Sequence, residues 1–179
     1  MSQNYRRSFF SVVGDALLTG GIITLLFLFG FFVSTLGNSQ EITVTKTETV
    51  VVIASDYEKA VNDLRHYNDL QRLNPNNKLR ESACLKAEHM IEQDYWAHNS
   101  PDGTEPWHFF TTVGYEYKIA GENLARGYDS ADDVLTAWYD SPSHRNNILG
   151  DYREQGICAK DGMYMGKVQT LIVQHLGSK

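Results

Sequence analysis

The chain has 179 residues, of which 42% are hydrophobic and 12% aromatic, enough apolar material for one folded domain. Its net charge of −6 excludes the basic field that attracts phosphates, so no nucleic-acid partner is expected. Only two cysteines occur, Cys84 and Cys158, which excludes a zinc site built from four cysteines.

An uncharged run from Ala16 to Leu36, dense in Leu, Ile, Phe and Val, is long enough to span a bilayer as a helix. Two arginines precede it, and the positive-inside rule then places the N-terminus in the cytoplasm and the rest of the chain outside. A cleaved signal peptide, with secretion of the domain, is the alternative, although its apolar region is usually shorter. The expected organisation is a cytoplasmic segment at 1–15, a transmembrane anchor at 16–36, a linker at 37–55 and a folded domain at 56–179.

Two helices are expected at the start of this domain. Ser55-Asp56-Tyr57-Glu58 is a capping-box pattern, and apolar residues follow it at helical spacing as far as Leu70. The Asn-Pro-Asn-Asn run at 74–77 breaks the pattern. A second helix is expected from about Leu79 to Asp94, with small alanines on its apolar stripe that suit close packing against a sheet or another helix.

The middle of the chain combines short helices with one extended segment, marked by caps and glycines. The expected elements are a loop at 96–103, a helix at 105–113, a strand or extended segment at 115–127, a helix capped by Ser130, and a short helix that begins at Ser141-Pro142, carries His144 and ends at Gly150.

The C-terminal part is expected to be a β-hairpin, and a final strand is expected to end the domain. Asp161-Gly162 is a strong type I′ turn signal between two strand-like runs, and "QTLIVQHLG" supplies the final strand. Helices therefore come first and a mainly antiparallel sheet closes the chain. This order predicts the α+β class, with helices covering the faces of the sheet.

Three polar residues stand out as candidates for chemistry: His98 in a loop, Glu122 between a glycine and an apolar stretch, and His144 at the start of a short helix. Imidazole and carboxylate groups together form either a zinc or copper site or an acid–base pair. They also serve in packing, and spacing alone does not separate these roles. Common nucleotide-binding, hydrolase and HExxH motifs are absent from the sequence.

Several motifs, taken in order, resemble one known family. They are "NDLR" at 62–65, "HNSPDG" at 98–103, "GENLARG" at 121–127, "AWYDSPSHRNNIL" at 137–149 and "VQHLG" at 173–177. The chain is similar over the whole outer domain to the CAP superfamily (cysteine-rich secretory proteins, antigen 5, pathogenesis-related 1), in its bacterial extracytoplasmic branch, also called SCP-like.

This resemblance implies an α-β-α sandwich with a central cleft. Animal and plant members line that cleft with two histidines and two glutamates, often seen with a divalent metal. Carried over by motif, these positions correspond to His98, Glu122 and His144. The second glutamate falls near Ser141, with Asp140 beside it, as in the bacterial branch. The resemblance thus implies a three-ligand site for Zn²⁺ or another divalent metal, with substitution of the second glutamate by Asp140 as the alternative.

Three functions follow from the sequence. The favoured one is a membrane-anchored binding module that holds a metal, a small apolar ligand or a cell-wall component. The second is a metal-assisted hydrolase, a peptidase or cell-wall enzyme, with Glu122, His144 and His98 as candidate catalytic residues. The third is a structural or adhesive envelope protein. Binding is favoured over catalysis because no nucleophile–base–orienter set is evident. The two cysteines either form a disulfide outside the membrane or remain two buried thiols.

Overall fold

The computed structural model describes residues 46–179, with side chains from residue 54 onward. The predicted cytoplasmic segment at 1–15 and the predicted anchor at 16–36 lie outside these residues, as does the first part of the predicted linker. Within the described part of the chain, the helices are too short or too polar to cross a membrane.

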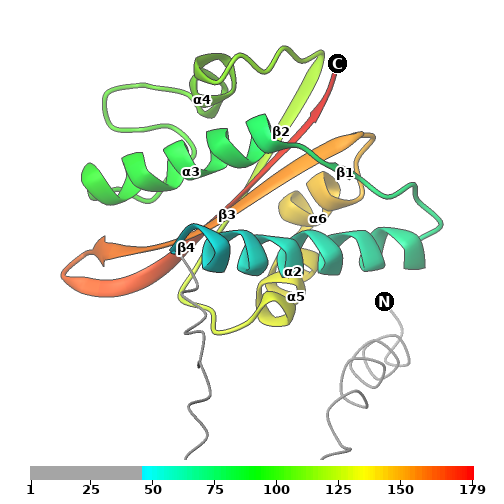
Figure 1. Ribbon diagram of the computed structural model, residues 1–179, viewed down its shortest axis with the longest axis horizontal. Helices are drawn as coiled ribbons and strands as arrows, with labels where there is room; N and C mark the ends of the chain where they lie inside the picture. Colours follow the sequence, from blue (N-terminus) through cyan, green and yellow to red (C-terminus); the bar gives the residue numbers. More distant parts are fainter. Residues whose placement is uncertain (1–45) are drawn as a thin grey trace, which may run out of the picture. The chain divides into compact units, whose positions relative to one another are not determined.

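The described elements form one sheet with helices on both sides (Figure 1). The helices are α2 (Lys46–Tyr67), α3 (Asn77–Glu92), α4 (Pro106–Thr112), α5 (Ala131–Asp140) and α6 (Pro142–Ile148). The strands are β1 (Asn74–Pro75), β2 (Ile119–Arg126), β3 (Glu154–Tyr164) and β4 (Lys167–Ser178).

The sheet has the order β1-β3-β4-β2, with β4 antiparallel to both β3 and β2, and β1 parallel to β3. In Figure 1, α3 and α4 lie on one side of the sheet, and α2, α5 and α6 on the other. The α+β class and the layered arrangement expected from the sequence are confirmed for the described residues.

The helix α2 begins at Lys46, upstream of Ser55, where the capping box predicted its start. No proline or glycine lies between these two residues, so nothing in the local sequence ends the helix there. The start of α3 matches the prediction closely. Its N-cap is Asn76, whose side chain accepts hydrogen bonds from the backbone N–H groups of Lys78 and Leu79.

The prediction that the hairpin turns at Asp161-Gly162 is wrong. Both residues lie within β3, and the two-residue turn is Met165-Gly166, with Tyr164 opposite Lys167. Both turn residues have positive φ, 48° and 74°, as a type I′ turn requires. The observed register places the apolar block around Cys158 opposite the block around Val173. The register is therefore set by burial of these two blocks, and the local turn signal does not determine it.

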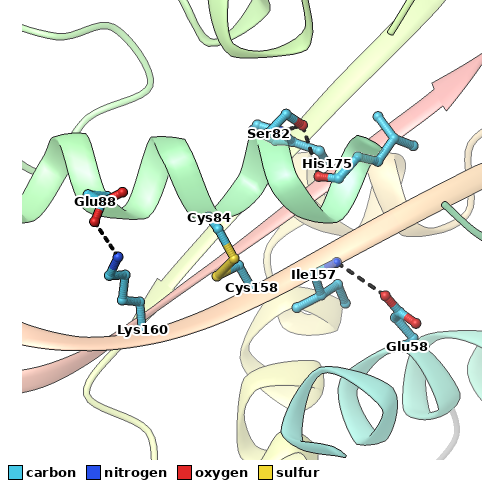
Figure 2. The surroundings of a disulfide bond; sticks show 9 residues. Glu58, Ser82, Cys84, Glu88, Ile157, Cys158, Lys160 and His175 are labelled. Carbon is cyan, nitrogen blue, oxygen red and sulfur yellow. Dashed lines mark hydrogen bonds and ion pairs between the residues drawn. A yellow bond between two sulfur atoms is a disulfide. The ribbon is translucent and has the colours of Figure 1, made fainter. Parts of the chain in front are cut away.

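Close packing joins α3 to β3 (Figure 2). A Cβ atom at Gly156 would lie 2.1 Å from the backbone nitrogen of Arg80, so only glycine permits this approach. Further along the same two elements, Cys84 and Cys158 form a disulfide, with their Cα atoms 5.1 Å apart. The sequence left open whether the two cysteines form a disulfide or remain buried thiols, and in the structure they form the disulfide.

Side chains cover both long edges of the sheet. On the β3 edge, the carboxylate of Glu58 from α2 accepts the backbone N–H of Ile157 (Figure 2). On the β2 edge, three carbonyl groups accept side-chain donors from α5, α6 and the segment after α6. These bonds run from Tyr152 to Ala120, from Asn147 to Glu122 and from Trp138 to Leu124. The edge of β2 is thus attached to the helices that carry His144.

Candidate functional site

Glu122 is the centre of a buried polar network. It lies within β2, and its side chain is 2% exposed. Its Oε1 accepts a hydrogen bond from Nδ1 of His98 at 2.5 Å, and its Oε2 accepts one from Nε2 of His175 at 3.1 Å. Both carboxylate oxygens therefore have an imidazole partner.

His175 extends this network into the core. It lies opposite Glu122 on β4 and is fully buried. Its Nδ1 is 2.7 Å from the hydroxyl of Ser82 on α3 (Figure 2), and its ring stacks on Phe110 at 4.3 Å between centroids. A neutral ring donates Nε2–H to Glu122, and its unprotonated Nδ1 then faces the Ser82 hydroxyl, which also donates to the carbonyl oxygen of Leu79 at 2.9 Å.

Burial and hydrogen bonding set the charges in this network. Burial lowers the pKa of His175, although Glu122 opposes this shift, so the ring is neutral near pH 7. For Glu122, burial favours the neutral acid, but the hydrogen bonds from His175 and His98 and the charge of Lys86 outweigh it. The pKa of Glu122 is therefore lowered, and its carboxylate is ionised at neutral pH.

Lys86 fixes the loop that carries His98. This lysine is fully buried on α3, and its Nζ donates to the Tyr95 hydroxyl and to the carbonyl oxygens of Ala97 and His98, at 3.0, 3.0 and 2.5 Å. Burial lowers the pKa of Lys86, while the charge of Glu122 raises it. The His98 side chain itself is 54% exposed, so the ring lies at the surface of the domain.

His144 reaches the same region from α6. The amide of Asn123 on β2 donates to the His144 carbonyl and to Gln174, and Asn147 on α6 donates to the Asn123 amide oxygen. These bonds fasten α6 against β2. Burial lowers the pKa of His144, and the charge of His98 lowers it further.

A groove of about 360 Å³ opens beside His144. Its walls are formed by the end of β2, by α5 and α6, and by the residues that follow α3 and β2. The lining residues are Trp96, Leu124, Ala125, Arg126, Tyr128, Ala137, Trp138, Ser141 and His144. Three aromatic residues, one arginine, one histidine and one serine are thus among the lining residues, and none of the lining residues is acidic.

The arrangement does not fit the predicted three-ligand metal site of His98, Glu122 and His144. Glu122 uses each carboxylate oxygen for an imidazole, and the hydroxyl of Ser141 stands where relatives were expected to have a carboxylate. Asp140 is exposed and does not line the groove. Among the side chains of residues 54–179, no three His, Cys, Asp or Glu residues are grouped so that they could hold a metal ion.

The three predicted residues, His98, Glu122 and His144, lie in one region of the structure but make different contacts there. His98 and Glu122 share a hydrogen bond, whereas His144 lines the groove. Sequence reasoning missed His175 and Lys86. A signal for His175 was present, because it follows Leu171 and Val173 at the two-residue spacing of a buried strand face.

Comparisons with known proteins agree with this architecture. The family model named "Cysteine-rich secretory protein family", with the short name CAP, matches residues 58–171. A Bacillus subtilis (strain 168) protein described as uncharacterized protein YkwD is 36% identical over 114 residues. That match covers 60% of this chain but only 44% of the relative, less than half of its length.

Two solved structures share the fold. One is an extracellular protein containing a SCP domain from Bacillus anthracis, with a TM-score of 0.64, 20% identity, and coverage of 74% of this chain and 42% of that one. The other is an outer surface protein from Borrelia burgdorferi, with a TM-score of 0.59, 22% identity, and coverage of 68% of this chain and 89% of that one. From the family match and the fold together, the chain belongs to the cysteine-rich secretory protein (CAP) family.

Proposed function

We propose that this protein is an extracytoplasmic binding module whose groove beside His144 holds a small organic molecule with an apolar or aromatic body. The groove itself carries the proposal. Its volume lies within the range of roughly 300–1,000 Å³ that small-molecule sites occupy, and it combines aromatic walls with a few polar groups. The buried network around Glu122 then serves to hold the walls of the groove in place.

The proposed location rests on two further observations. The disulfide between Cys84 and Cys158 suits an oxidising compartment, and the two structural relatives above are described as extracellular or outer-surface proteins.

We propose that residues 16–36 anchor the domain to the membrane. Fractionation of cells that express the full chain or a variant lacking residues 16–36 tests this. Equal amounts of both proteins in the membrane fraction would contradict the anchor.

A neutral aromatic probe tests binding in the groove. N-acetyltryptophanamide is titrated into the full-length chain in phosphatidylcholine nanodiscs, with empty nanodiscs as the blank. We expect saturable binding to the wild type and its loss in Ala137→Phe, because the added ring fills the groove. Thr111→Phe is the matched control, since Thr111 is exposed on α4 and does not line the groove. Binding that survives Ala137→Phe would place the probe elsewhere.

Hydrolysis remains a second candidate because of one contact. The carboxylate of Glu122 orients the half-exposed His98 ring through Nδ1 and does not engage Nε2, and a general base can be held in this way. Turnover of p-nitrophenyl acetate by the full chain, compared with His98→Gln and Glu122→Gln, tests this candidate. A wild-type rate equal to that of both variants would remove hydrolysis of this ester class from consideration.

A further inference from the structure

We propose that Arg126 is the anion-binding residue of the groove, and that the ligand carries a carboxylate on its apolar body, as a fatty acid or an N-acylated amino acid does. This inference rests on the proposed function, because it names the chemical class of ligand that the same groove takes.

Two aromatic rings hold the Arg126 side chain at the end of β2. The central carbon of its guanidinium lies 4.8 Å from the ring centre of Trp96 and 4.7 Å from that of Tyr164. Such contacts attract a cation to the face of an aromatic ring. Contact with an aromatic ring uses none of the oxygen-binding capacity of the five N–H donors of a guanidinium, so these donors can still bind an acceptor.

No acceptor from residues 54–179 fills that position. Among these residues the Arg126 side chain contacts the two rings and makes no ion pair or hydrogen bond. Every other arginine in this part of the chain donates to oxygen. These bonds are Arg65 to the carbonyls of Gln71, Ile148 and Gly150, Arg72 to Asp63, Arg80 to Glu58, Arg145 to the Tyr139 carbonyl, and Arg153 to Asp151 and Gln71. Among residues 54–179, Arg126 is therefore the arginine that aromatic rings hold in place and that has no anionic partner.

The position of Arg126 in the groove favours a ligand that carries an anionic group. It lines the groove together with His144, and none of the lining residues is acidic, although the whole chain has a net charge of −6. A carboxylate matches the planar donor fork of arginine with two parallel hydrogen bonds. The rings of Trp96, Tyr128 and Trp138 would then contact the apolar body of the same ligand.

Matched acid and amide probes test this assignment. The full-length chain in phosphatidylcholine nanodiscs is titrated by calorimetry with N-acetyltryptophan against N-acetyltryptophanamide, and with octanoate against octanamide. Each pair differs only in the charged group, and the two pairs separate an amino-acid source of the carboxylate from a fatty-acyl source. The variant is Arg126→Gln. The control is Arg72→Gln, which removes one positive charge at an exposed ion pair with Asp63.

We expect the wild type and Arg72→Gln to bind the acid of at least one pair at least about tenfold more tightly than its amide, because the acid adds a charge-assisted, two-pronged hydrogen bond. Arg126→Gln should bind acid and amide equally. Equal binding of acid and amide by the wild type would overturn the role of Arg126 and leave the proposed function intact. An Arg126→Gln variant that still binds the acid more tightly than the amide would also overturn the role of Arg126 and leave the proposed function intact. If none of the four probes binds the wild type, both proposals fail.

Discussion

Glu122 on β2 and His175 on β4 are cross-strand partners, and the hydrogen bond between Oε2 and Nε2, 3.1 Å long, lies in the core of the domain. Through the second oxygen of Glu122, this bond continues to His98 at the surface. A buried carboxylate thus links a core imidazole to an exposed one. Because burial makes such contacts sensitive to protonation, stability should depend on pH.

The first prediction concerns acid stability. The pKa of His175 is lowered in the folded state from an ordinary value of 6.5, so below about pH 6.5 the unfolded chain binds a proton that the folded chain does not. The free energy of unfolding should therefore fall as the pH drops from 8 to 5. His144, whose pKa is also lowered, contributes in the same direction. Below about pH 4.5, where Glu122 becomes protonated in the unfolded chain, a further loss is expected because the folded-state pKa of Glu122 is lowered.

Urea unfolding at several pH values measures this dependence. His175→Gln should reduce the slope between pH 8 and 5, because the contribution of His175 is gone and only that of His144 is left. His66→Gln is the matched control, since His66 is exposed on α2 and should leave the wild-type slope unchanged. A variant at position 175 with the full wild-type slope would show that His175 does not cause the dependence.

The disulfide should contribute strongly to stability. It closes a loop with a sequence separation of 74 residues, and the chain-entropy relation gives about 4 kcal/mol for such a loop. A Cys84→Ala/Cys158→Ala double variant should lose a large part of this free energy of unfolding in urea. Treatment of the wild type with a reductant should lower its urea midpoint in the same way, while the double variant does not respond. An unchanged midpoint in both cases is inconsistent with a stabilising bond.

Gly156 should tolerate no side chain. A Cβ atom there meets the backbone of α3 at Leu79 and Arg80, which moves only if the whole helix shifts. At Gly162, by contrast, the Cβ would meet only the side chain of Ile91, which can change rotamer. Gly156→Ala should therefore lower the melting temperature much more than Gly162→Ala. Similar losses in the two variants would show that α3 and β3 are less closely packed than described.

Metal binding at His98, Glu122 and His144 is a prediction from the family resemblance, which the geometry around Glu122 does not favour. We expect zinc, titrated by calorimetry, to bind the wild type no more tightly than a His98→Ala/His144→Ala variant. One zinc bound tightly by the wild type, and lost in the double variant, would mean that these side chains rearrange into a metal site. The two histidines would then be ligands rather than neighbours.

Much of the fold could be predicted from the sequence because its signals are local. The cap at Ser130 and the apolar periodicity of α3 depend on neighbouring residues. The pairing of β2 with β4 is not local, and that pairing is what brings His175 against Glu122. The hairpin shows the same limit, since burial of distant apolar blocks prevailed over the Asp161-Gly162 signal.

The residues of the candidate site also differ in whether a local sequence signal marks them. His98, Glu122 and His144 were found because their motifs mark them, whereas Arg126 was not singled out. Its significance arises from Trp96 and Tyr164, which come to it from the loop after α3 and from the end of β3. A side chain held by partners so distant in sequence cannot be recognised from spacing along the chain.

The indole N–H signals in a ¹⁵N–¹H NMR titration test the central claim, that the groove beside His144 binds a small organic ligand. Trp96 and Trp138 line the groove, whereas Trp107 packs against Phe110 and Tyr117 and does not. With N-acetyltryptophan as the probe, the account predicts saturable shifts in the signals of Trp96 and Trp138 and no shift for Trp107. Shifts confined to Trp107, or no shift in any of the three signals, would contradict it.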